Sequence, residues 1–340
     1  MRGCRILRFV LAVLVLTAGG ISGSPAAGAE KVQLATSYLP HGGNMGYWVA
    51  LGRGLYKDAK LEVAIGRGYG SLDTIKRVDA KQVDFGEGDA GTLIVARTRG
   101  VRVKEVGMIY HDGQYAAYAL KSSGIRRPKD MEGRSVGGVS AGATESLFPA
   151  FLRRNDVDES KVKFVPMTAA ATVPSLLAGN VDIILTFALT GVGIKEKALA
   201  QGKDIVEFLY SDYGLPLYSN GVVGHDDSIQ GKPDRVRKFV DATLRGYVWA
   251  AENPAGAAEI FHKFNPTADK GLAERMWKKT MQFIFTPETK KTGIGIMGRK
   301  KMEFTRDIIT QYMKLSTKIP VEDIYTNELV PKGIYPKGLK

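Results

Sequence analysis

The chain has 340 residues, with 48 Lys and Arg against 35 Asp and Glu, a net charge of +13 and one cysteine. Its hydrophobic content of 44% is that of a globular protein with a core. A single cysteine excludes an intramolecular disulfide and a cysteine-based metal cluster, and the four histidines are too far apart for a helical H-x-x-x-H metal motif. The length predicts about two domains or lobes.

Residues 1–29 have the three parts of a secretory leader. Three arginines lie within the first eight residues, residues 9–16 (FVLAVLVL) form an apolar stretch too short to span a bilayer, and residues 27–29 (AGA) match a cleavage signal. We expect cleavage before Glu30 and export to the periplasm. Cleavage would remove Cys4 and lower the net charge to +10.

The positive charge alone does not indicate a nucleic-acid-binding protein. Basic residues are mixed with acidic ones, as in residues 57–60 (KDAK), and the densest run, residues 299–301 (RKK), is short. No zinc-finger or RNA-binding signature accompanies it. The charge favours, at most, anionic ligands or an anionic membrane surface.

From residue 31 onward, strand-like and helix-like segments alternate, which predicts α/β units with mostly parallel sheets covered by helices. In the first unit we predict strands over residues 32–38, 61–65, 83–85 and 103–110, and helices over residues 44–54, 71–80 and 90–99.

A second α/β unit follows, and the rest of the chain is almost entirely helical. We predict strands over residues 115–120, 135–139, 162–166, 181–187 and 205–210, helices over 143–154, 172–178 and 193–200, an extended segment over 217–223, and helices over 233–253, 254–264, 268–285 and 298–315.

The segments 115–120 and 217–223 frame the second unit and predict two hinge strands between lobes. We therefore expect a discontinuous lobe I (30–114 and 222–340) and an inserted lobe II (115–221). In α/β sheets, ligands bind at the carboxyl ends of strands, so this arrangement predicts a binding cleft between the lobes.

Residues 86–91 (GEGDAG) match the G-x-G-x-x-G pattern of dinucleotide-binding loops. Glu87 and Asp89 would place two carboxylates where a pyrophosphate has to lie, and like charges repel there. We interpret the segment instead as a tight strand-to-helix turn with Asp89 as the helix cap.

A better candidate for ligand contact is the segment 137–145 (GGVSAGATE), where a strand ends and a helix begins. The free N–H groups of the helix start, with the hydroxyls of Ser140 and Thr144, suit a carboxylate, sulfonate, phosphate or ring heteroatom. Either hydroxyl could equally cap the helix. Glu145 could accept hydrogen bonds from a ring amine, or simply occupy the first helical turn.

The loop 38–44 (YLPHGGN) carries Tyr38, His41 and Asn44 at the end of the first strand. Aromatic side chains in clefts stack on flat ligands, and His or Asn can orient them. The alternative is a solvated loop with Tyr38 packed on the core. No serine-hydrolase motif, defensible Ser/His/Asp spacing or cysteine nucleophile accompanies these residues.

Several segments, in this order, resemble the type II periplasmic substrate-binding proteins of ABC importers. The branch is the one that holds nitrate, sulfonate, taurine and thiamine-pyrimidine binders. The matching segments are 54–56 (GLY), 61–63 (LEV), 68–70 (GYG), 83–86 (VDFG) with Asp89, 176–182 (LLAGNVD), 212–218 (DYGLPLY) and 323–327 (DIYTN).

This resemblance implies a two-lobed Venus-flytrap fold that closes on a small ligand and docks on an ABC permease and its ATPase. It implies a monomer with no cofactor and no catalytic residues. The ligand-binding residues that we expect are Tyr38, His41, Asn44, Gly70, Ser71, Asp89, Ser140, Gly142, Ala143, Thr144, Glu145, Thr186, Phe187, Tyr218 and Asn220.

The sequence leaves the ligand and two alternative functions open. Tyr38, His41, Phe187 and Tyr218 favour a flat heteroaromatic ligand, whereas the helix start at 140–144 and the basic charge favour a small organic anion. The same family includes fungal enzymes that make the thiamine pyrimidine from their own histidine and pyridoxal phosphate. Those enzymes carry a cysteine-rich motif that the mature chain lacks. A ligand-presenting subunit of a sensor is the other alternative.

Overall fold

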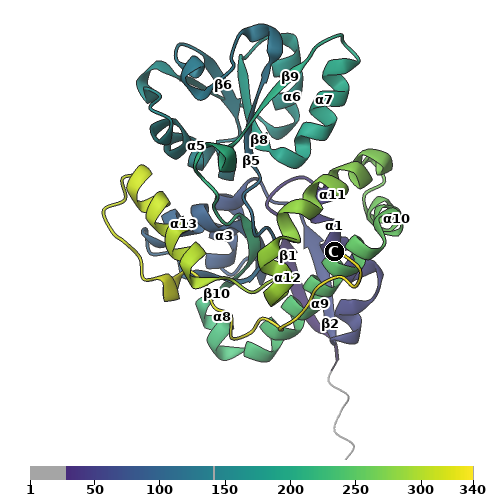
Figure 1. Ribbon diagram of the computed structural model, residues 1–340. Helices are drawn as coiled ribbons and strands as arrows, with labels where there is room; N and C mark the ends of the chain where they lie inside the picture. The colour runs from purple at the N-terminus through teal and green to yellow at the C-terminus, as the bar shows by residue number, and fades with distance from the viewer. Residues whose placement is uncertain (1–27, 141, 340) are drawn as a thin grey trace, which may run out of the picture.

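A computed structural model describes residues 28–140 and 142–339, so most of the expected leader lies outside the described residues. The described chain forms two five-stranded sheets, each with helices on its faces, stacked as an upper and a lower part (Figure 1). We call the part built on the first sheet lobe I and the part built on the second sheet lobe II.

Lobe I has the strand order β2-β1-β3-β10-β4, in which β1 is parallel to β2 and β3 while β10 is antiparallel to both of its neighbours. The strands are β1 (Glu30–Ala35), β2 (Leu61–Gly66), β3 (Phe85–Asp89), β4 (Val103–Met108) and β10 (Asn220–His225). The helices among them are α1 (Met45–Gly52), α2 (Leu55–Asp58), α3 (Ser71–Asp79), α4 (Ala90–Arg97) and α8 (Asp226–Gly231).

Lobe II repeats this plan with the order β7-β6-β8-β5-β9, and here β5 is the antiparallel strand. Its strands are β5 (Tyr115–Leu120), β6 (Ser135–Gly138), β7 (Lys163–Pro166), β8 (Ile183–Phe187) and β9 (Ile205–Leu209). Its helices are α5 (Ala143–Arg154), α6 (Ala169–Ala178) and α7 (Gly191–Leu199).

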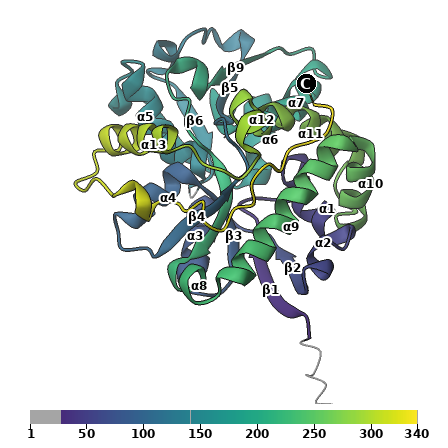
Figure 2. The same ribbon diagram turned by 60° about the horizontal axis from the view of Figure 1, so that its bottom comes forward.

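After β10 the chain is mostly helical as far as Tyr312, and its last described residues run along lobe I largely without regular structure (Figure 2). Pro233 and Pro254 each occupy the first turn of a helix, where the missing N–H group costs nothing. The helices are α9 (Pro233–Glu252), α10 (Pro254–Phe264), α11 (Lys270–Ile284), α12 (Pro287–Thr292) and α13 (Arg299–Tyr312). Helix α12 is absent from our sequence prediction. Among the described residues, no helix is long and apolar enough to cross a membrane.

The chain passes between the lobes twice, through residues 109–114 and 210–219. Each passage leads directly into an inner antiparallel strand, β5 in lobe II and β10 in lobe I. The first segment predicted as a hinge strand, 115–120, is therefore strand β5 of lobe II. The second, 217–223, lies partly in the crossing, up to residue 219, and partly in strand β10 of lobe I.

The predicted glycine turn at residues 86–91 is wrong, because Phe85–Asp89 is strand β3, paired with β1 and β10. The glycines serve close packing instead: a Cβ at Gly86 would lie 2.5 Å from Thr74 Cγ2, and one at Gly88 would lie 2.9 Å from Val223 Cγ1. Neither contact leaves room for a side chain. The predicted cap is confirmed, since Asp89 accepts a hydrogen bond from the Thr92 N–H group.

Candidate ligand-binding cleft

A small pocket lies where the two lobes meet, and the space within its outline, open solvent included, is about 340 Å³. Four segments contribute to its wall, two from each lobe. The lining residues are Ser37, Tyr38, Gly70, Ser71, Val139, Gly142, Ala143, Thr144, Glu145, Leu185, Thr186 and Phe187.

The lobe I wall is formed by the end of β1 and the start of α3. The Ser37 N–H group donates to Glu87 Oε2 (3.1 Å), and Asn220 Nδ2 donates to Ser37 Oγ (2.9 Å). Burial raises the pKa of Glu87 to about 6, although its hydrogen bonds from Ser37 and Asn220 act in the opposite direction. Glu87 and Asn220 thus lie behind the wall and hold Ser37 in place.

Ser71 is the first residue of α3 and is almost fully buried, with 2% of its surface exposed. Within the described residues its Oγ has no hydrogen-bond partner. Gly70 before it has a φ of 119°, a conformation that favours glycine. Since buried hydroxyls normally have a partner, the Ser71 Oγ is available to a ligand in the pocket.

His41 does not line this pocket, although its ring lies 6.3 Å from that of Tyr38. Its ring Nδ1 accepts a hydrogen bond from the backbone N–H group of Gly43 (2.9 Å), and the backbone N–H group of His41 donates to Asn44 Oδ1 (3.2 Å). These bonds close a capping box on the short helix η1 (Gly42–Asn44). Burial lowers the pKa of His41 to about 4, so the ring is neutral at physiological pH.

The lobe II wall begins with the loop between β6 and α5. Glu145 lies in the first turn of α5 and turns back on this loop, where its Oε1 accepts from the Val139 N–H group at 2.6 Å. A Cβ at Gly138 or at Gly142 would collide with this side chain. Burial raises the pKa of Glu145 to about 7, against the lowering effect of its hydrogen bonds.

The end of β8 completes the lobe II wall with Leu185, Thr186 and Phe187. Thr186 Oγ1 lies 3.4 Å from Thr190 Oγ1. The Phe187 ring packs at 6.3 Å from that of Tyr115, which gives the pocket an aromatic surface on this lobe. Tyr38 supplies the aromatic surface of lobe I.

Nine of the residues predicted from sequence line this pocket and six do not. The six are His41, Asn44, Asp89, Ser140, Tyr218 and Asn220. Asp89 is used as the cap of α4 and as acceptor for the Tyr115 hydroxyl. Ser140 is exposed and borders a second hollow, which Glu145 also lines. Among the lining residues, Ser37, Val139 and Leu185 were missed; each directly neighbours a predicted site residue or motif position.

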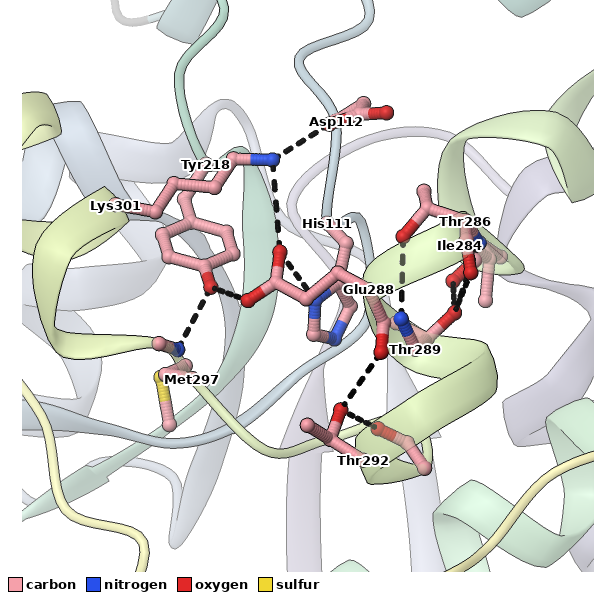
Figure 3. A network of polar contacts seen from close by, with 12 residues as sticks. His111, Asp112, Tyr218, Ile284, Thr286, Glu288, Thr289, Thr292, Met297 and Lys301 are labelled. Carbon is pink, nitrogen blue, oxygen red and sulfur yellow. Dashed lines mark hydrogen bonds and ion pairs between the residues drawn. The ribbon is translucent and has the colours of Figure 1, made fainter.

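Tyr218 is not a lining residue of the pocket and belongs to a polar cluster between the crossings and the C-terminal helices (Figure 3). Its hydroxyl donates to Glu288 Oε1 (2.8 Å) and accepts from the Gly298 N–H group (2.8 Å). Lys301 lies over the Tyr218 ring and pairs with Asp112 Oδ1 at 2.5 Å. Tyr218 therefore stabilises the crossing region through these contacts.

The two-sheet fold with its pocket between the lobes is that of the type II periplasmic binding proteins, as comparison with solved structures shows. The alkanesulfonate-binding protein SsuA from Xanthomonas axonopodis pv. citri, bound to MOPS, superimposes with a TM-score of 0.70. The match covers 89% of this chain and all of that one, at 11% identity.

Residues 43–257 match the family model described as NMT1/THI5 like, and the chain belongs to this family. A riboflavin-binding protein, RibY, from Chloroflexus aurantiacus is 26% identical, over 90% of this chain and 88% of its own. A formylaminopyrimidine-binding protein from Halalkalibacterium halodurans is 20% identical, over 91% and 93%. A 4-amino-5-hydroxymethyl-2-methylpyrimidine phosphate synthase from Legionella pneumophila is 22% identical, over 84% and 88%.

Proposed function

We propose that this protein is the periplasmic solute-binding component of an ABC importer, which captures a small organic ligand in the cleft and delivers it to the permease. The observation that carries this proposal is the pocket itself, since both lobes contribute its wall. A ligand that contacts both walls stabilises the closed arrangement of the lobes, and closure is the signal that a permease can recognise.

The aromatic surfaces favour a flat heteroaromatic ligand. Tyr38 on lobe I and Phe187 on lobe II are aromatic residues of the pocket lining, and the Ser71 hydroxyl has no hydrogen-bond partner among the described residues. Relatives named for riboflavin and for formylaminopyrimidine support this ligand class.

The expected leader supports export. A basic start, an apolar stretch and a cleavage signal precede Glu30, the first residue of β1. We propose that the two lobes move as units and bend at the two crossings, residues 109–114 and 210–219. The expected boundary between residues 221 and 222 then moves to the start of β10, which belongs to the lobe I sheet. The permease and its ATPase would then receive the ligand at the inner membrane.

A binding role is better supported than catalysis. The enzyme alternative is suggested by the synthase among the relatives. In the family that the sequence resembles, the fungal enzymes use one of their own histidines as a reactant. Here His41 is engaged in the capping box of η1 and does not line the pocket, and the mature chain has no cysteine. We therefore propose that the ligand leaves the cleft unchanged.

Mass spectrometry of the natively purified protein tests this function. The protein is isolated from the periplasm of its own host without refolding, denatured, and the released small molecules are measured. We expect a heteroaromatic compound in near-stoichiometric amount, and much less of it from the Tyr38→Ala/Phe187→Ala double variant. An exposed aromatic change, Tyr69→Ala, is the control. No ligand in the wild type, or equal amounts in both proteins, would contradict the proposal.

A further inference from the structure

A hollow on the surface of lobe I, separate from the ligand cleft, carries basic and aromatic side chains. Its walls come from the C-terminal end of α1, the second half of α9 and residues 332–337, which approach these helices near the end of the described chain (Figure 1). None of the described residues lines both this hollow and the cleft. Ligand capture therefore leaves the hollow unexplained.

The lining has an excess of positive charge. Four exposed basic side chains contribute to it: Arg53, Arg245, Lys332 and Lys337. Glu252 is the single acidic residue in the described part of the lining. Of the four basic residues, only Arg245 has a carboxylate partner among the described residues, Asp241 Oδ2 at 2.7 Å. The other three positive charges are thus directed to solvent.

The C-terminal wall is attached firmly to the rest of the protein. The Glu252 carboxylate accepts a hydrogen bond from the backbone N–H group of Lys337 (2.7 Å), so this acid is engaged with the chain itself. The carbonyl of Ile334 accepts from the backbone N–H group of Ile294 (2.8 Å). These bonds fix residues 332–337 against α9, and they hold the two lysines of this segment at the edge of the hollow.

Two half-buried aromatic rings lie among the basic groups. The Arg53 guanidinium lies over the Trp249 ring at 4.8 Å, and the Tyr335 ring packs at 5.7 Å from that of Phe285. Tryptophan and tyrosine combine an apolar ring with a polar group, and for this reason they are enriched where proteins meet the headgroups of a lipid bilayer. The hollow therefore combines the two side-chain types that favour such a surface.

The exposure of the basic groups indicates an extended partner instead of a small anion. A pocket for a small ligand encloses it and directs a few fixed polar groups at it. Here the basic side chains are exposed and are distributed over all three walls. This arrangement fits a surface with many negative charges, such as a layer of anionic lipid headgroups. The net charge of the chain, +13, acts in the same direction at longer range.

We propose that this hollow is a membrane-contact surface, through which lobe I associates with anionic phospholipids while the cleft stays free for the ligand. The inference goes beyond ligand capture, and it rests on the proposed function only for the membrane that an exported protein meets. Contact of this kind would keep the protein close to a membrane-embedded permease.

Sedimentation with lipid vesicles tests the proposal. We expect the wild type to bind vesicles of equal parts phosphatidylglycerol and phosphatidylcholine, and to bind phosphatidylcholine vesicles far more weakly. The triple variant Arg53→Gln/Lys332→Gln/Lys337→Gln should bind the anionic vesicles about tenfold to a hundredfold more weakly, because each basic residue near such a surface strengthens binding by about fivefold. Hydrogen–deuterium exchange at residues 332–337 of the wild type should slow when anionic vesicles are added.

The matched control is Lys76→Gln/Arg99→Gln/Lys163→Gln, which removes the same charge at three exposed residues outside the hollow and the cleft. It should retain most of the vesicle binding. Thermal unfolding checks both variants. If the first folds poorly, Lys332→Gln/Lys337→Gln, which leaves Arg53 on Trp249, should still lose binding by at least fivefold.

Three outcomes would overturn the membrane-contact surface. They are no binding of the wild type to anionic vesicles, equal losses in the hollow variant and the control, and displacement from vesicles by inorganic phosphate at constant ionic strength. The last would indicate a small-anion site. Each of these outcomes leaves solute capture standing, because the vesicle assay needs no cleft ligand. The absence of a native ligand would instead count against the proposed function alone.

Discussion

Asp89 shows how a single carboxyl can stabilise the junction between the lobes without facing the ligand. Its Oδ1 accepts from the Thr92 N–H group (2.7 Å) and the Thr92 hydroxyl (2.9 Å), and its Oδ2 accepts from the Tyr115 hydroxyl. It therefore caps a helix of lobe I and holds the first residue of a lobe II strand. Burial raises the pKa of Asp89.

We predict that Asp89→Ala lowers the free energy of unfolding by about 1–3 kcal/mol, because a helix cap is lost and the buried Tyr115 hydroxyl keeps only one of its two acceptors, the Tyr218 carbonyl (2.9 Å). Urea denaturation monitored by circular dichroism measures this change. Asp234→Ala, which removes a carboxyl that is 82% exposed, is the control and should change stability by less than about 0.5 kcal/mol. Similar losses in both variants would contradict the role of Asp89.

The second residue-scale prediction concerns Glu145 and pH. Its pKa is about 7 in the folded protein against an ordinary value of 4.5, so the folded state binds more protons than the unfolded state between these values. The wild type therefore loses stability as the pH rises from 4.5 through about 7. Glu145→Gln lacks this loss.

We therefore compare the free energies of unfolding of Glu145→Gln and the wild type at about pH 4 and at about pH 8. The difference between the two proteins should shift in favour of Glu145→Gln by about 1–3 kcal/mol from the lower to the higher pH. Urea titrations of both proteins without ligand, at the two pH values, give this difference. Thr144→Ala, which changes the neighbouring pocket residue without changing charge, should keep a constant offset from the wild type. A constant offset for Glu145→Gln would show that the carboxyl titrates normally.

At the scale of elements, the polar cluster in Figure 3 joins four segments that are distant in sequence. His111 and Asp112 belong to the first crossing, Tyr218 to the second, Glu288 to α12 and Lys301 to α13. His111 is fully buried, and its Nδ1 lies 3.9 Å from Glu288 Oε2. Burial lowers the pKa of His111, so the ring is neutral beside the Glu288 carboxylate. Through these contacts, the C-terminal helices α12 and α13 hold both crossings in place.

We predict that Tyr218→Phe loosens these contacts, since Glu288 loses a donor and the Gly298 N–H group loses its acceptor. Hydrogen–deuterium exchange should become faster in residues 286–302 and at both crossings, with a loss of about 1–2 kcal/mol of stability. Tyr69→Phe, at a ring that is 63% exposed, is the control. Unchanged exchange at the crossings would show that the cluster only stabilises the C-terminal helices.

At the scale of the whole molecule, the described arrangement has the lobes in contact beside the pocket. Helix α11 of lobe I meets α7 of lobe II, where the Arg275 guanidinium makes two bonds to the Glu196 carboxylate, at 2.7 and 3.0 Å. On the other side, Arg154 of α5 reaches the Tyr312 hydroxyl of α13 (3.3 Å). Opening of the lobes would break these contacts.

We expect Arg275→Gln to shift the ligand-free protein toward open forms. An exposed ion pair contributes about 0–1 kcal/mol, so the ratio of closed to open forms should fall by at most about fivefold. Small-angle X-ray scattering should give a larger radius of gyration for the variant at low salt and a smaller difference at high salt. Arg299→Gln removes ion pairs that lie within lobe I and serves as the control. A constant radius in all three proteins would argue against opening at this contact.

The sequence by itself determined the order of the elements and the class of fold. Alternating short strands and helices are local patterns, set by spacing of apolar residues, prolines and caps, and most of them were predicted within a few residues. The helix at Ala143–Arg154 and the strand at Tyr115–Leu120 match their predicted bounds. The carboxyl ends of the strands also pointed to the loops where most of the pocket lies.

Only the tertiary structure decided which side chains face the pocket. Asp89, His41 and Tyr218 lie in segments that the sequence predicts as cleft loops. In the structure their side chains are hydrogen-bonded to other protein groups, either far along the chain or in the same loop. Glu145 bends back onto Val139 because two glycines leave space for it, and Glu87 supports Ser37 from behind the wall. Local patterns specify backbone conformation, whereas the direction and charge state of a side chain depend on packing and burial by distant segments.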